Sequence, residues 1–364
     1  MNRSLLSTLL LATCAFLAIH AEDLKIDWDK ARELHQRAQR GDKLSPDEQK
    51  YYEEAQRQYN KPGGPGAPGG QPGQPGKQDP PPPAPTNLVP LTELTTTYQG
   101  QDGGLYGAGK NDPPAELAAR AKNAAAQIRP LDAQGKPAAD GKIVLMSIGM
   151  SNTTQEFSAF KAIADTDPRK SPSTIVLDGA QGGQTAQAWA STDRPWDEAA
   201  RRIQAAGLTP AQIQVLWIKE ANAGPSAGWP AETDRLRDDM KKLITRAREK
   251  YPNVKLIFLS SRIYAGYATT RLNPEPYAYE GAFAMRAVIK DQPTTTDSPA
   301  ILWGPYLWTN GEKGRALDSL KWLKEDCGPD GTHPSNSGRE KVAHLLLDFF
   351  TKNPYATPWF MKRS

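Results

Sequence analysis

Ser151 follows a run of aliphatic residues at a point where the run stops. Residues 142–148 read Lys-Ile-Val-Leu-Met-Ser-Ile, a composition typical of a buried strand, and Gly149 and Met150 separate them from Ser151. Such a serine either belongs to an ordinary turn or is a nucleophile held at the edge of a sheet. Ester hydrolysis by a serine needs the attacking hydroxyl, a base that takes its proton and donors that hold the oxyanion.

His333 is the candidate base. Histidine is the usual base because its pKa lies near neutrality. The chain has four histidines, and among them only His333 falls in a loop of the main domain. Asp330 precedes it by three residues, a spacing that lets the carboxylate hold one imidazole nitrogen while the other faces a serine. The alternative for this segment is a turn leading into a helix capped by Ser335 or Asn336.

Apolar runs that alternate with helical patterns indicate the elements that position these residues. Strands are predicted at residues 142–148, 173–178, 212–219, 254–260 and 300–303. Helices are predicted at residues 155–165, 195–206, 231–250, 277–291, 315–325 and 336–351. Strands that are apolar on both faces and alternate with helices indicate a parallel sheet covered on both sides. Ligands of such folds bind at the carboxyl ends of the strands.

Polar or glycine-rich segments follow four of the predicted strands, and a fifth precedes the last helix, at residues 149–152, 178–186, 217–225, 260–267 and 330–338. In chain order they supply Ser151, Gly183, Asn222 and Asp330-x-x-His333. This set resembles the SGNH (GDSL-like) hydrolase superfamily over roughly residues 140–350. Gly149-Met150-Ser151-Asn152 is similar to the first motif of the carbohydrate acetylesterases in that superfamily, and residues 330–338 are similar to their last.

The resemblance implies a three-layer α/β/α sandwich around a mostly parallel five-stranded sheet, the flavodoxin-like SGNH hydrolase fold. It implies that Ser151, His333 and Asp330 are catalytic, and that Gly183 and Asn222 supply oxyanion donors.

Two positions depart from the pattern. Met150 stands where better-known members have Asp or Gln. In the third motif, Ala221 falls where the oxyanion asparagine belongs, one place before Asn222. Either a one-residue bulge brings Asn222 into place, or Lys219 or Glu220 lines the site and the oxyanion hole rests on the amides of Ser151 and Gly183.

The residues expected to bind substrate follow the third and fourth strands. Arg262 and Tyr264 come directly after the fourth strand, and Lys219 ends the third. Aromatic faces stack on the apolar faces of sugars, but aromatic rings also fill protein cores. A structural contact is the alternative for Arg262 and Tyr264.

The composition and residue spacing argue against several other classes of function. Lys and Arg number 45 against 41 Asp and Glu, a net charge of +4, and the chain has no concentrated basic stripe that favours nucleic acid. No cluster of His, Cys and Asp has metal-ligand spacing, so we expect neither a metal nor a cofactor. The chain has two cysteines, and Cys327 has no partner if Cys14 is removed with a leader sequence.

The N-terminal quarter of the chain is predicted to contain a signal peptide, a short helical hairpin and a linker. Residues 1–21 carry Arg3, an apolar run and a small residue before Glu22, as in a secretory signal peptide; the lipoprotein alternative uses Cys14. Residues 22–60 read as a short helical hairpin, which either docks on the main domain, binds in the envelope or is a weakly folded spacer. In it, Ser45 and Glu48 form a capping-box pattern. Residues 61–86 read as a Pro/Gly-rich linker, and residues 87–364 as the catalytic domain.

Two functions are compatible with these patterns. The first is a secreted or periplasmic serine esterase that removes short acyl groups, acetyl above all, from a polysaccharide or glycoside. The alternative is an inactive esterase-like module that binds carbohydrate, which Met150 and the irregular third motif favour. In both cases the partner is a small-molecule or glycan ester rather than nucleic acid, no membrane span is expected, and the oligomeric state is not indicated.

Overall fold

The computed structural model describes residues 26–27, 30–31, 33–34, 37, 44–59, 80–295 and 297–362. They fall into two units, residues 1–73 and residues 74–364, and each is described by itself. The predicted signal peptide, Cys14 and most of the predicted linker lie outside the described residues.

The N-terminal unit contains helix α2, Pro46–Tyr59. Its start has the predicted capping box, because the Ser45 amide donates to Glu48 Oε2 at 2.8 Å and the Glu48 amide donates to Ser45 Oγ at 3.3 Å. Arg37, in an earlier helical segment, pairs with Glu48 at 2.6 Å. Leu34 and Ala55 are each 2% exposed.

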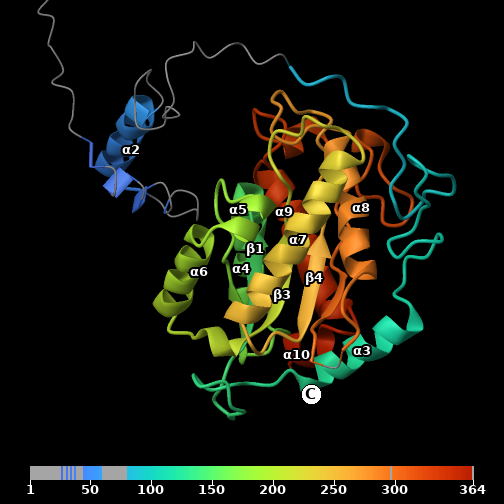
Figure 1. The fold of residues 1–364 in the computed structure, drawn as a ribbon. Helices are drawn as coiled ribbons and strands as arrows, with labels where there is room; N and C mark the ends of the chain where they lie inside the picture. Colours follow the sequence, from blue (N-terminus) through green and yellow to red (C-terminus); the bar gives the residue numbers. More distant parts are fainter. Residues whose placement is uncertain are drawn as a thin grey trace, which may run out of the picture. The chain divides into compact units, whose positions relative to one another are not determined.

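A five-stranded parallel sheet forms the centre of the main unit (Figure 1). Its strands are β1 Ile143–Gly149, β2 Thr174–Leu177, β3 Ile213–Lys219, β4 Leu256–Ser260 and β5 Ala300–Trp303. They lie in the order β2-β1-β3-β4-β5, and every pairing is parallel. This is the flavodoxin-like strand order, and the predicted fold class is confirmed. All five predicted strands are present, with ends shifted by two residues at most.

Helices cover both faces of the sheet, as Figure 1 shows, with α7 and α8 in front and α4 and α9 behind. The helices of the main unit are α3 Ala115–Gln127, α4 Ser151–Thr166, α5 Ala186–Ser191, α6 Arg194–Ala205, α7 Ala231–Lys250, α8 Tyr277–Lys290, α9 Asn336–Lys352 and α10 Thr357–Phe360. Helix α4 packs on α9, whereas α7 packs on both α5 and α8. Strands β1, β3, β4 and β5 are buried along their whole lengths, since helices cover both faces.

The predicted helix at residues 315–325 is wrong. The segment is irregular and ends in a single 3-10 turn, Lys324–Asp326. The buried Arg315 guanidinium donates to the carbonyls of Tyr306 and Trp308, and Ser319 has a left-handed φ of 58°. These hydrogen bonds and the left-handed residue are incompatible with a continuous helix over the segment. Helices α3, α5 and α10 were not predicted. Within the described part of the chain, no helix is long and apolar enough to cross a membrane.

Candidate active site

Ser151 is the first residue of α4 and lies at the carboxyl end of β1. The strand ends in glycine because the helix turns back over it. A Cβ on Gly149 would meet the side chain of Thr153 at 2.4 Å. Thr153 Oγ1 in turn donates to the Lys219 carbonyl at 2.7 Å, which ties the first turn of α4 to the end of β3. The backbone around Ser151 is therefore fixed by two neighbouring strands.

The structure brings Ser151, His333 and Asp330 together across the carboxyl edge of the sheet. Ser151 Oγ lies 2.6 Å from His333 Nε2. His333 Nδ1 lies 2.6 Å from Asp330 Oδ2. An ionised carboxylate only accepts hydrogen bonds, so Nδ1 carries the proton and Nε2 is the acceptor for the serine hydroxyl. This is the order of contacts that a nucleophile, base and orienting acid require.

The turn that carries Asp330 keeps its carboxylate ionised. Burial alone would raise the pKa of Asp330, but the hydrogen bond from His333 and the backbone amides of His333 and Thr332 outweigh burial and hold the pKa well below its usual value. Both amides donate to Asp330 Oδ1 at 3.0 Å. The side chains of Asp330 and His333 remain 29% and 30% exposed, so the hydrogen bond between them is accessible to solvent.

The loop after β2 places Gly182 beside Ser151. The Gln181 amide donates to the Gly149 carbonyl at 2.9 Å, and a Cβ on Gly182 would lie 3.9 Å from Ser151 Cβ. Within residues 80–295 and 297–362, no acceptor takes a hydrogen bond from the amides of Ser151, Gly182 or Gly183. These amides are available to an oxyanion, and Gly182 is a candidate donor that the sequence did not single out.

Met150 leaves the start of α4 without a side-chain cap. Its own side chain is 5% exposed and packs in the apolar core. Met150 therefore contributes to core packing and does not cap the helix.

Asn222 bridges two helices. Its Oδ1 accepts from the Gln187 amide at 2.9 Å, and its Nδ2 donates to Asp239 Oδ2 at 2.8 Å. Gln187 belongs to α5 and Asp239 to α7, and Asn222 is only 5% exposed. The role of Asn222 as an oxyanion donor stays a prediction. The backbone amides of Ser151, Gly182 and Gly183 donate to no acceptor within the described residues.

The position of Lys219 disagrees with the expectation that this residue contacts the substrate. Its ammonium contacts both carboxylate oxygens of Glu156 at 2.6 and 2.8 Å, and both side chains are 0% exposed. Burial lowers the pKa of Lys219 to about 8, while the attraction of Glu156 opposes this shift. A solvent-borne substrate does not reach a fully buried ammonium. Glu156 was not predicted, although it shares an inward-facing helical spacing with Asn152 and Phe160.

Glu220 is a second buried carboxyl beside this ion pair. Burial raises its pKa well above the usual value, against the amide of Ala221 and the charges of Arg262 and Lys219. Its Oε2 accepts from the Ala221 amide at 3.2 Å, while Oε1 has no partner among the described residues. Glu220 is 1% exposed and therefore does not line the solvent-facing site.

Arg262 is also buried, and a substrate contact for it stays a prediction. It is 3% exposed, and its Nη2 donates to the Thr332 carbonyl at 3.4 Å. Tyr264 is half-buried and meets Tyr267 edge-on, with ring centroids 5.3 Å apart. A substrate contact for Tyr264 stays a prediction.

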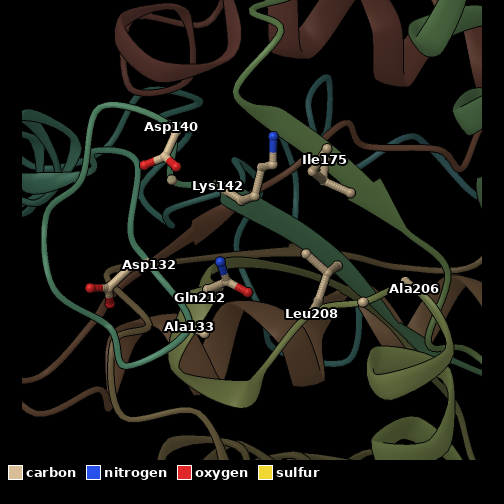
Figure 2. A pocket seen from close by; sticks show the side chains of 10 residues that line it. Asp132, Ala133, Asp140, Lys142, Ile175, Ala206, Leu208 and Gln212 are labelled. Atoms are coloured by element: carbon tan, nitrogen blue, oxygen red, sulfur yellow. The ribbon is translucent and has the colours of Figure 1, made fainter.

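A hollow of about 320 Å³ lies at the opposite edge of the sheet (Figure 2). It is lined by Asp140, Lys142 and Gln212, among others, which precede β1 and β3. Strand β1 alone spans roughly 20 Å, so this hollow is separate from the Ser151 relay. No group of three or more His, Cys, Asp or Glu side chains within the described residues is placed to hold a metal ion.

Comparison with known proteins gives only remote similarities. No protein-family model matches the chain, and no curated protein matches it. A carbohydrate esterase family 3 structure from Talaromyces cellulolyticus is 13% identical, covering 56% of this chain and 94% of its own, with a TM-score of 0.36. The periplasmic domain of a lipopolysaccharide acetyltransferase from Salmonella ser. Paratyphi A is 12% identical, covering 57% and 84%, with a TM-score of 0.37. A protein from Arabidopsis thaliana is 12% identical, covering 54% and 67%, with a TM-score of 0.34.

Proposed function

We propose that this protein is a secreted serine esterase that hydrolyses short acyl esters, acetyl esters above all, on a polysaccharide or glycoside. The observation that carries the proposal is the continuous set of contacts from Ser151 Oγ through the His333 imidazole to the Asp330 carboxylate, each at 2.6 Å. Its members come from two segments separated by 182 residues.

The first half of the reaction transfers the acyl group to the serine. Ser151 Oγ attacks the acyl carbon while its proton passes to His333 Nε2. The negative charge on the carbonyl oxygen falls beside the free amides of Ser151 and the Gly182-Gly183 segment. The bond to the leaving alcohol then breaks, and the alcohol takes the proton from His333.

The second half releases the acid. A water molecule gives a proton to His333 Nε2 and attacks the acyl carbon of the ester on Ser151. The bond to Ser151 Oγ breaks, the serine regains its proton from His333 and the carboxylic acid departs. Asp330 keeps the imidazole in the required tautomer throughout and stabilises its positive charge, without taking the proton.

The choice of an acetyl group and a sugar rests on the resemblance of residues 149–152 and 330–338 to carbohydrate acetylesterases. The test is release of acetate from acetylated glycans by the purified protein, compared with 4-nitrophenyl acetate, butyrate and octanoate. We expect turnover to fall steeply from acetate to octanoate. If the folded protein releases no acetate and binds the glycans instead, the inactive binding-module alternative holds.

A further inference from the structure

The loop between β4 and α8, residues 261–276, holds the turn that carries His333. The Thr269 amide donates to the Asp330 carbonyl at 2.9 Å. A Cβ on Gly331 would lie 1.8 Å from the Tyr267 carbonyl oxygen, so the loop backbone is in direct contact with the turn. Gly331 also has a left-handed φ of 65°, which glycine tolerates best. Two successive residues of the turn are thus fixed by this loop.

Arg262 contacts the next residue of the turn. Its guanidinium donates to the carbonyl of Thr332, the residue bonded to His333. The cation is 3% exposed, and its Nε has no partner within the described residues. Burial lowers the pKa of Arg262, while the charges of Glu156 and Glu220 oppose the shift. A buried cation with few hydrogen bonds is costly unless nearby anions compensate, and the charge of Asp330 also opposes the shift.

The base of the loop is itself held firmly. The buried Glu275 carboxylate accepts from the Ala265 amide at 2.9 Å, from Trp308 Nε1 at 2.8 Å and from the Tyr279 amide at 3.0 Å. Farther along, Tyr267 donates its hydroxyl proton to the Trp322 carbonyl at 3.0 Å. The loop is therefore a fixed support on which the turn rests.

We propose that Arg262 is a positioning residue, which acts through the Thr332 carbonyl to set the His333 imidazole within reach of Ser151. It makes no contact with substrate, because it is buried beneath the turn. The inference rests on the proposed esterase activity for its kinetic consequences, but the position of the imidazole is measurable without any substrate.

The kinetic test compares Arg262→Met and Arg262→Lys with wild type on 4-nitrophenyl acetate. A displaced base slows the proton transfer and leaves substrate binding unchanged, so we expect kcat to fall about a hundredfold in Arg262→Met with KM unaltered. Arg262→Lys, which keeps the charge, recovers part of this loss. In a His333→Ala background, Arg262→Met has no further effect. A rise in KM at constant kcat would overturn the proposal and make Arg262 a substrate contact.

The second readout is the proton NMR signal of the hydrogen bond between His333 Nδ1 and Asp330. It reports the position of the imidazole whether or not the protein is an esterase. We expect the signal to shift or broaden in Arg262→Met. The matched control is Arg286→Met, since Arg286 is also buried and donates to two backbone carbonyls, those of Asp102 and Gly104. This control leaves the signal in place.

Gly331→Ala tests the same support if Arg262→Met does not fold. Its added methyl group meets the Tyr267 carbonyl and displaces the turn from the loop. We expect the same loss of kcat and the same change in the imidazole signal. An unchanged imidazole signal in a folded variant, at either position, refutes the positioning role. An inactive wild type whose signal still responds to Arg262→Met refutes the esterase proposal alone.

Discussion

Replacement of Ser151 by alanine is expected to lower kcat for 4-nitrophenyl acetate on the order of a millionfold, because no other group in the relay can form the acyl intermediate. Ser151 Oγ contacts His333 Nε2 at 2.6 Å, and Ser151 is only partly buried, so its removal leaves the core unchanged. The measurement is steady-state hydrolysis, together with a thermal melt that shows the variant to be folded.

His333→Ala should be as inactive as Ser151→Ala, and the double variant little worse than either, since a nucleophile without its base is nearly inert. Asp330→Asn should lose less, about 10⁴-fold, because the acid orients the imidazole without receiving its proton. A serine-directed phosphonate should label wild type once, at Ser151. Folded wild type that is neither labelled nor active would contradict the esterase proposal.

Lys219→Met is expected to lower the free energy of unfolding by about 3–5 kcal/mol, because it leaves a buried carboxylate without its counter-ion. Lys219 and Glu156 are both 0% exposed and make two short contacts. Removing both charges, in Lys219→Met with Glu156→Leu, should restore most of the loss. The measurement is urea unfolding of the purified protein.

The control is the exposed pair of Lys161 and Asp165 on α4, whose side chains are 44% and 38% exposed. Lys161→Met should cost less than about 1 kcal/mol, because solvent screens a surface ion pair. Equal effects of Lys161→Met and Lys219→Met would show that the buried pair does not stabilise the fold as argued.

The sequence alone determined the strands and the order of the chemical groups. Each strand is a local run of apolar residues, and burial on both faces needs no partner-specific information. Asp330 and His333 are three residues apart in one loop, so their contact is also local. Their proximity to Ser151 was predicted because ligands of parallel sheets bind at the carboxyl ends of the strands.

Only the tertiary structure decided what the charged residues next to this edge do. Position in the sequence placed Lys219 at the end of one strand and Arg262 just after another, where both substrate contact and burial were open. The partner of Lys219 is Glu156, 63 residues away, and the contact of Arg262 is Thr332, 70 residues away. Whether a charge faces solvent or a buried counter-charge depends on which helices and turns pack above it. That packing is set by the summed contacts of distant segments, which no local pattern records.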